Sequence, residues 1–118
     1  MALFDRLYNK SESGALTWKE TVQDDMFSVA FKDFSVSIRP VAVDFDEIDY
    51  YFEIRNENGE VVDQFKDTEL SQLCSSDVER KALFKKVETL YEIARRNARG
   101  ADKALTSILK QLDEDFPF

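Results

Sequence analysis

The spacing of apolar residues changes once along this chain, and the change limits the folds open to it. Between residue 27 and residue 66, several runs carry an apolar side chain at every second position, the period of a β-strand with one buried face. From residue 76 to residue 112 apolar side chains recur at every third or fourth position, the period of an amphipathic helix. We therefore predict an α+β domain with an antiparallel sheet of about four to five strands, followed by two C-terminal helices packed on one face.

The alternation changes parity between Phe31 and Phe34. A regular strand keeps its parity, so Lys32-Asp33 is predicted to form a tight turn or a bulge. Pro40 is expected to end the second alternating run, because proline lacks the N–H group that a sheet ladder needs.

A hairpin is predicted around Asn58-Gly59, which lies between two alternating runs. Both residues tolerate positive φ, as a type I′ turn requires. That turn pairs Ile54 with Asp63 and Arg55 with Val62. A longer loop with a glycine bulge pairs Ile54 with Val62 instead, and both registers remain open.

Helical signals begin at Ser76, which forms the pattern of a capping box with Glu79. Gly100 is predicted to end this helix, and Asp102 to cap a second helix after a short connection. Four apolar residues make one stripe on the second helix: Leu105, Ile108, Leu109 and Leu112.

Several function classes are disfavoured by residues that the sequence lacks. There is no histidine, which removes the commonest general base and zinc ligand. The sequence also has no Gly-rich phosphate loop and no nucleophile elbow. The acids of residues 44–49 do not have the spacing of an EF-hand and are interpreted as a solvated loop. We expect no enzymatic activity, no catalytic residue, no metal and no cofactor.

The expected location is the cytoplasm. No apolar run approaches the roughly 20 residues of a membrane span, and the N-terminus has no secretion signal. Cys74 is the single cysteine, which fits a reducing compartment.

The net charge of −8 is unevenly distributed. Residues 1–76 hold 16 acids and 7 bases, whereas residues 77–110 hold 5 acids and 9 bases. The bases include a cluster at the junction of the two predicted helices: Arg95, Arg96, Arg99 and Lys103. This cluster can bind the phosphates of single-stranded nucleic acid or of a small anion, or it can complement the helix dipole and pair with the acidic sheet.

Aromatic side chains on the strands offer a second candidate surface for nucleic acid, because unstacked bases stack on aromatic rings. The candidates are Tyr51, which lies on the opposite side of its strand from Phe52, and Trp18. Most of the aromatic residues are expected to form the core.

The sequence closes with an acidic tip, Asp113-Glu114-Asp115-Phe116-Pro117-Phe118, which follows a single domain at residues 1–112. The tip resembles the acidic Pro-Phe docking peptide of bacterial single-stranded DNA-binding proteins (SSBs). The resemblance implies a protein partner with a basic, apolar pocket, such as a DNA replication or repair enzyme. Packing of Phe116 and Phe118 on the domain's own core is the alternative.

These observations lead to one main functional hypothesis. We expect a small non-catalytic protein of bacterial or phage origin, active in DNA metabolism or phage–host conflict. It would dock partner proteins through the tip and contact single-stranded DNA, without membrane contact. The alternatives are an oligomeric protein that captures a small anionic ligand such as a nucleotide at the basic helix corner, or a structural subunit of an assembly.

Overall fold

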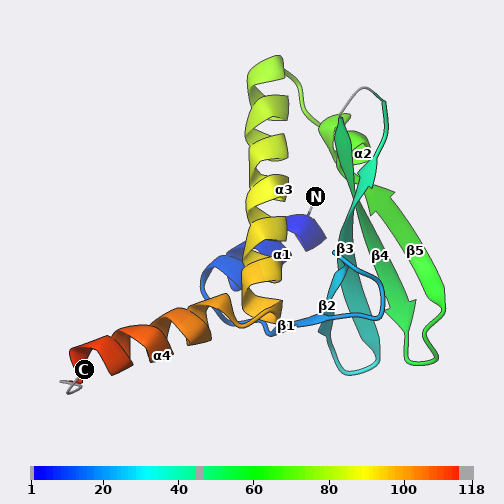
Figure 1. Cartoon of the computed structure of the whole chain (residues 1–118). Coiled ribbons are helices and arrows are strands. Elements are labelled where there is room, and N and C mark those ends of the chain that lie inside the picture. The colour runs from blue at the N-terminus through cyan, green and yellow to red at the C-terminus, as the bar shows by residue number, and fades with distance from the viewer. Residues whose placement is uncertain (1, 45–46, 115–118) are drawn as a thin grey trace.

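The computed structural model describes residues 2–44 and 47–114 and confirms the α+β class (Figure 1). Five strands form one antiparallel sheet in chain order: β1 (Trp18–Glu20), β2 (Phe27–Ala30), β3 (Phe34–Ala42), β4 (Ile48–Asn56) and β5 (Val61–Lys66). The described helices are α1 (Ala2–Glu12), α2 (Asp67–Ser71), α3 (Asp77–Ala98) and α4 (Ala101–Asp113).

The core lies between one face of the sheet and two helices, α1 and α3 (Figure 1). Val87, Leu90 and Ala94 on α3 are completely buried, because their spacing places them on the stripe that faces the strands. From α1, Phe4 meets the ring of Phe52 edge to face with the centroids 6.0 Å apart. The inward strand residues are Trp18, Phe27, Val29, Val36, Ile38, Tyr50, Phe52 and Phe65.

The turn between β2 and β3 forms as predicted, whereas the strand end at Pro40 does not. Phe31 N–H donates to the carbonyl of Phe34 at 2.7 Å, which closes a tight turn over Lys32-Asp33. The expectation that Pro40 ends the strand was wrong, since β3 continues to Ala42. Strand β2 pairs with β3 only as far as Ile38, so β3 has a free edge beyond it, where a sheet tolerates proline.

The register of the β4–β5 hairpin combines features of both predicted registers. Ile54 pairs with Asp63, as the first register requires, but Arg55 pairs with Val61 and not with Val62. A bulge at this point takes up Val62 as an extra residue. The pairing of Asp63 with an apolar residue is allowed because β5 is an edge strand and the Asp63 side chain is exposed.

Ser76 caps the start of α3 as predicted, whereas the return bond of the capping box goes to Ser75 and not to Ser76. Ser76 Oγ accepts a hydrogen bond from Glu79 N–H at 3.2 Å. The Glu79 carboxylate accepts from the N–H and hydroxyl of Ser75 at 2.9 and 3.1 Å, and these bonds hold the pKa of Glu79 below its usual value.

The junction of α3 and α4 is a sharp corner at Gly100, whose φ of +71° favours glycine. The prediction that Asp102 caps α4 was wrong, because Gly100 occupies the N-cap position. Asp102 lies in the first turn of α4, where its carboxylate accepts from Arg96 Nη2 at 2.8 Å.

The two C-terminal helices differ in their packing. Helix α3 covers the sheet as predicted, whereas α4 extends away from the domain body and contains no buried residue (Figure 1). The radius of gyration, 16.8 Å, exceeds the roughly 13.5 Å expected for a compact chain of this length. The corner at Gly100 therefore turns α4 into an arm.

Candidate functional site

The apolar stripe of α4 is uncovered. Each of its four residues keeps about half or more of its surface exposed: Leu105 51%, Ile108 54%, Leu109 50% and Leu112 64%. Isolated exposed leucines are common, but a continuous apolar patch marks an interaction site. Sequence periodicity located this stripe but could not show that it lies outside the core.

The first acids of the predicted docking tip lie at the far end of this arm. Asp113 is the last residue of α4, and the N–H of Glu114 donates to the carbonyl of Lys110 at 2.9 Å. Asp115, Phe116, Pro117 and Phe118 lie outside the described residues. The arm, about 20 Å long for 13 residues, therefore separates Asp113 from the domain core.

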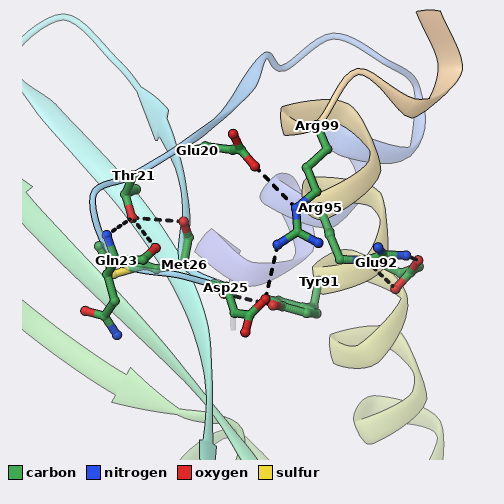
Figure 2. A network of polar contacts seen from close by, with 9 residues as sticks. All are labelled: Glu20, Thr21, Gln23, Asp25, Met26, Tyr91, Glu92, Arg95 and Arg99. Carbon is green, nitrogen blue, oxygen red and sulfur yellow. Dashed lines mark hydrogen bonds and ion pairs between the residues drawn. The ribbon is translucent and has the colours of Figure 1, made fainter. Parts of the chain in front are cut away.

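Arg99 contacts acids on a distant part of the chain (Figure 2). Its Nε lies 3.3 Å from Glu20 Oε1, and its Nη2 lies 3.2 Å from Asp25 Oδ1. Its guanidinium carbon also lies 5.2 Å from the ring centroid of Phe27, within cation–π range. Arg99, the C-cap residue of α3, thus joins the end of this helix to β1 and to the β1–β2 loop.

The other two arginines of the corner also have acidic partners. Arg95 pairs with Glu92 on the same helix, and both its Nε and its Nη2 take part. This pair raises the pKa of Arg95 and lowers that of Glu92. Arg96 pairs with Asp102, as described above, while Lys103 makes no ion pair within the described residues. The structure thus brings the predicted cluster together at one corner, where four nearby acids balance its four bases.

A second contact fixes the β1–β2 loop against α3 (Figure 2). The Tyr91 hydroxyl donates to the backbone carbonyl of Asp25 at 2.8 Å. Burial, with the nearby Asp25 carboxylate, raises the pKa of Tyr91 to about 12, so the phenol stays protonated at neutral pH. Asp25 itself has a φ of +62°, a left-handed conformation that aspartate tolerates better than most residues.

The two aromatic candidates lie in different environments. Trp18 is buried in the core, where its Nε1 donates to Ser11 Oγ at 3.0 Å, so it cannot stack on a base. Tyr51 lies on the sheet face opposite α3. Its ring centroid is 5.1 Å from the Arg39 guanidinium carbon and 5.4 Å from Lys66 Nζ.

A cavity of about 750 Å³ lies toward the N-terminal end of α3, near α2 and the start of β4. Its walls include apolar Ile48 and Phe84 and a buried carboxylate, Asp49. Acids outnumber bases in its lining, four to three. It therefore differs in both place and charge from the basic corner predicted to hold an anion.

Comparison with protein-family models, with curated proteins and with solved structures found no match to this chain. Within residues 2–44 and 47–114, no helix is both long and apolar enough to pass through a bilayer. The same residues contain no group of three or more carboxylate or thiol side chains placed to hold a metal ion.

Proposed function

We propose that this protein is a non-catalytic adaptor that docks a partner protein through α4 and the acidic tip that follows it. The setting we propose is DNA metabolism or phage–host conflict. The observation that carries the proposal is the uncovered apolar stripe of α4, with Leu109 at its centre and half exposed. The tip follows this arm in the sequence, and we propose that the stripe and the tip engage one partner together.

The chemistry of the tip defines the partner's pocket. Aromatic rings beside acidic side chains suit an apolar pocket with basic side chains at its edge. Pro117 restricts the backbone, so less conformational freedom is lost on docking. The acids speed the encounter with a basic surface. The resemblance to the SSB tip implies that enzymes which bind that tip have such a pocket.

The charge at the end of α4 disfavours parallel pairing with a second copy of this chain. Asp113 and Glu114 lie beside the last apolar residue of the stripe, Leu112. Parallel pairing of two such arms would place these acids against each other, and like charges close together disfavour association. A partner with basic residues around an apolar groove meets no such repulsion.

Displacement of a labelled SSB tip peptide from an SSB-binding enzyme tests the proposal. The full chain should displace the peptide, whereas a variant lacking residues 116–118 should fail to do so. A matched variant with Leu73→Ser changes an exposed leucine outside the arm and should displace the peptide as well as the unmodified protein. Failure of the full chain to compete would contradict the proposal.

Light scattering tests whether the stripe binds a partner protein or a second copy of this chain. We expect the 13.7 kDa monomer, and the same result for Leu109→Ser. A dimer that Leu109→Ser converts to monomer would assign the stripe to self-association and overturn this choice of partner.

A further inference from the structure

The face of the sheet opposite α1 and α3 carries an ordered set of polar and basic side chains. In Figure 1 the described helices α1 and α3 lie on one side of the sheet, and no described helix runs along the strands on the other. The ladder places Arg39, Tyr51 and Lys66 opposite one another on β3, β4 and β5. These three residues form a row across the open face.

The next row beside it is made of smaller side chains around one acid. Ser28 pairs with Ser37, Ser37 with Glu53, and Glu53 with Gln64. Because serine side chains are short, an extended chain can approach the backbone of β2 and β3 closely along this row.

The open face is basic although the whole chain is acidic. The outward strand residues Lys19, Arg39, Arg55 and Lys66 outnumber Glu53 and Asp49 by four to two, against a net charge of −8 for the chain. Asp49 is itself 5% exposed and accepts from Thr68 Oγ1 at 3.0 Å. An anionic ligand therefore finds an excess of positive charge on this face, although the chain as a whole is acidic.

The arginines of this face keep donors available. Arg39 Nε and Arg55 Nη2 share one carboxylate, that of Glu53, at 3.0 and 3.4 Å. Each guanidinium has five N–H donors, so most of them make no bond within the described residues. At the α3–α4 corner, in contrast, every arginine has its own acid.

We propose that this open face binds single-stranded nucleic acid, with a base stacked on Tyr51 and phosphates held by Arg39, Arg55 and Lys66. Two cations lie over the Tyr51 ring, and a base that stacks on the ring displaces one of them. The ring then supplies stacking for the base, and the cations supply charge for the backbone. The proposal moves nucleic-acid binding from the α3–α4 corner to the sheet, and it does not depend on partner docking through α4.

Fluorescence anisotropy with labelled oligothymidylate and oligouridylate of about 12 nucleotides tests this site. At about 50 mM salt the protein should bind at least one oligonucleotide, and the affinity should fall as salt rises, with a log–log slope near −2 for about three phosphate contacts. Tyr51→Leu should weaken binding roughly 5- to 100-fold, while Tyr51→Phe keeps the ring and should bind nearly as well. A preference for either oligonucleotide shows which of these two single strands the face binds more tightly.

Matched changes of charge complete the test. Lys66→Gln should reduce the salt slope by about 0.7, whereas Lys103→Gln, an exposed base on α4, should change nothing. Thermal unfolding of each variant verifies that the fold is kept. No binding of either oligonucleotide, or equal loss in Lys103→Gln and Lys66→Gln, would overturn the proposal. So would unchanged binding by a folded Tyr51→Leu.

Discussion

Tyr91 on α3 donates a hydrogen bond to the backbone carbonyl of Asp25, a residue 66 positions earlier in the chain. Together with Arg99, this bond attaches the β1–β2 loop to the helix that covers the sheet (Figure 2). The loop and the corner arginine therefore form part of the domain's architecture, which explains why this end of α3 is less available to a ligand than its basic sequence suggests.

Removal of the Tyr91 hydroxyl should lower stability. Tyr91→Phe leaves the Asp25 carbonyl without this donor, and we expect the free energy of unfolding to fall by about 0.5–1.5 kcal/mol in urea titrations. Tyr51→Phe is the matched control, because the Tyr51 hydroxyl makes no hydrogen bond within the described residues. Equal stability of the two variants would show that the Tyr91 bond contributes nothing.

The same phenol should make stability depend on pH in alkaline solution. Its pKa is about 12 in the folded protein and about 10 when exposed, so the unfolded chain loses this proton first. The contribution of Tyr91 is complete below pH 10 and is lost as pH rises toward 12. Urea unfolding across this range should show a steeper decline for the unmodified protein than for Tyr91→Phe. Burial also raises the pKa of Tyr50, so part of the decline should remain in the variant.

Two substitutions at Asp25 separate the effect of its ion pair from the effect of its left-handed backbone conformation. Asp25→Asn tolerates the positive φ and loses only an exposed ion pair with Arg99, so its cost should be below about 1 kcal/mol. Asp25→Val adds backbone strain of about 1–3 kcal/mol, because a β-branched residue fits this region poorly. Calorimetric melting of both variants checks the order, and a valine variant as stable as the asparagine variant would contradict it.

Local patterns predicted the elements that depend on neighbours in sequence. The alternation of Phe27, Val29, Val36 and Ile38 identified strands because a half-buried sheet requires it. Ser76 was recognisable as a cap since capping involves only the next three residues. The prediction at Pro40 was wrong because a strand tolerates proline where its neighbour has already ended. The local sequence does not encode where the neighbouring strand ends.

The candidate site depended more on contacts between distant segments. The arginines near Gly100 formed a plausible phosphate site in sequence, but the partners of Arg99 lie more than 70 residues away. A stripe such as that of Leu105 and Leu109 has the same period whether a helix is buried or exposed. The corner at Gly100 sets the direction of α4, and this direction decides whether the stripe is buried or exposed. The periodicity of apolar residues carries no information about that direction.

Removal of α4 should leave the domain folded. Among the residues that the structure describes, a chain that ends after Gly100 loses no buried residue and only one exposed ion pair, Arg96–Asp102. Its free energy of unfolding should therefore change by less than about 1 kcal/mol. Leu90→Ala, at a completely buried position of α3, should cost about 2–5 kcal/mol for comparison. Circular dichroism during urea unfolding measures both. A truncated chain as unstable as Leu90→Ala would show that α4 supports the core.

The most direct test of α4 and the tip as one docking surface is the dissociation constant for an SSB-binding enzyme, measured for four proteins. These are the unmodified chain, Leu109→Ser, a chain lacking residues 116–118, and the chain with both changes. We predict that each single change weakens binding by about tenfold or more, as expected when an interface loses over 1.4 kcal/mol. Binding by Leu109→Ser and by the shortened chain equal to that of the unmodified protein would contradict the account.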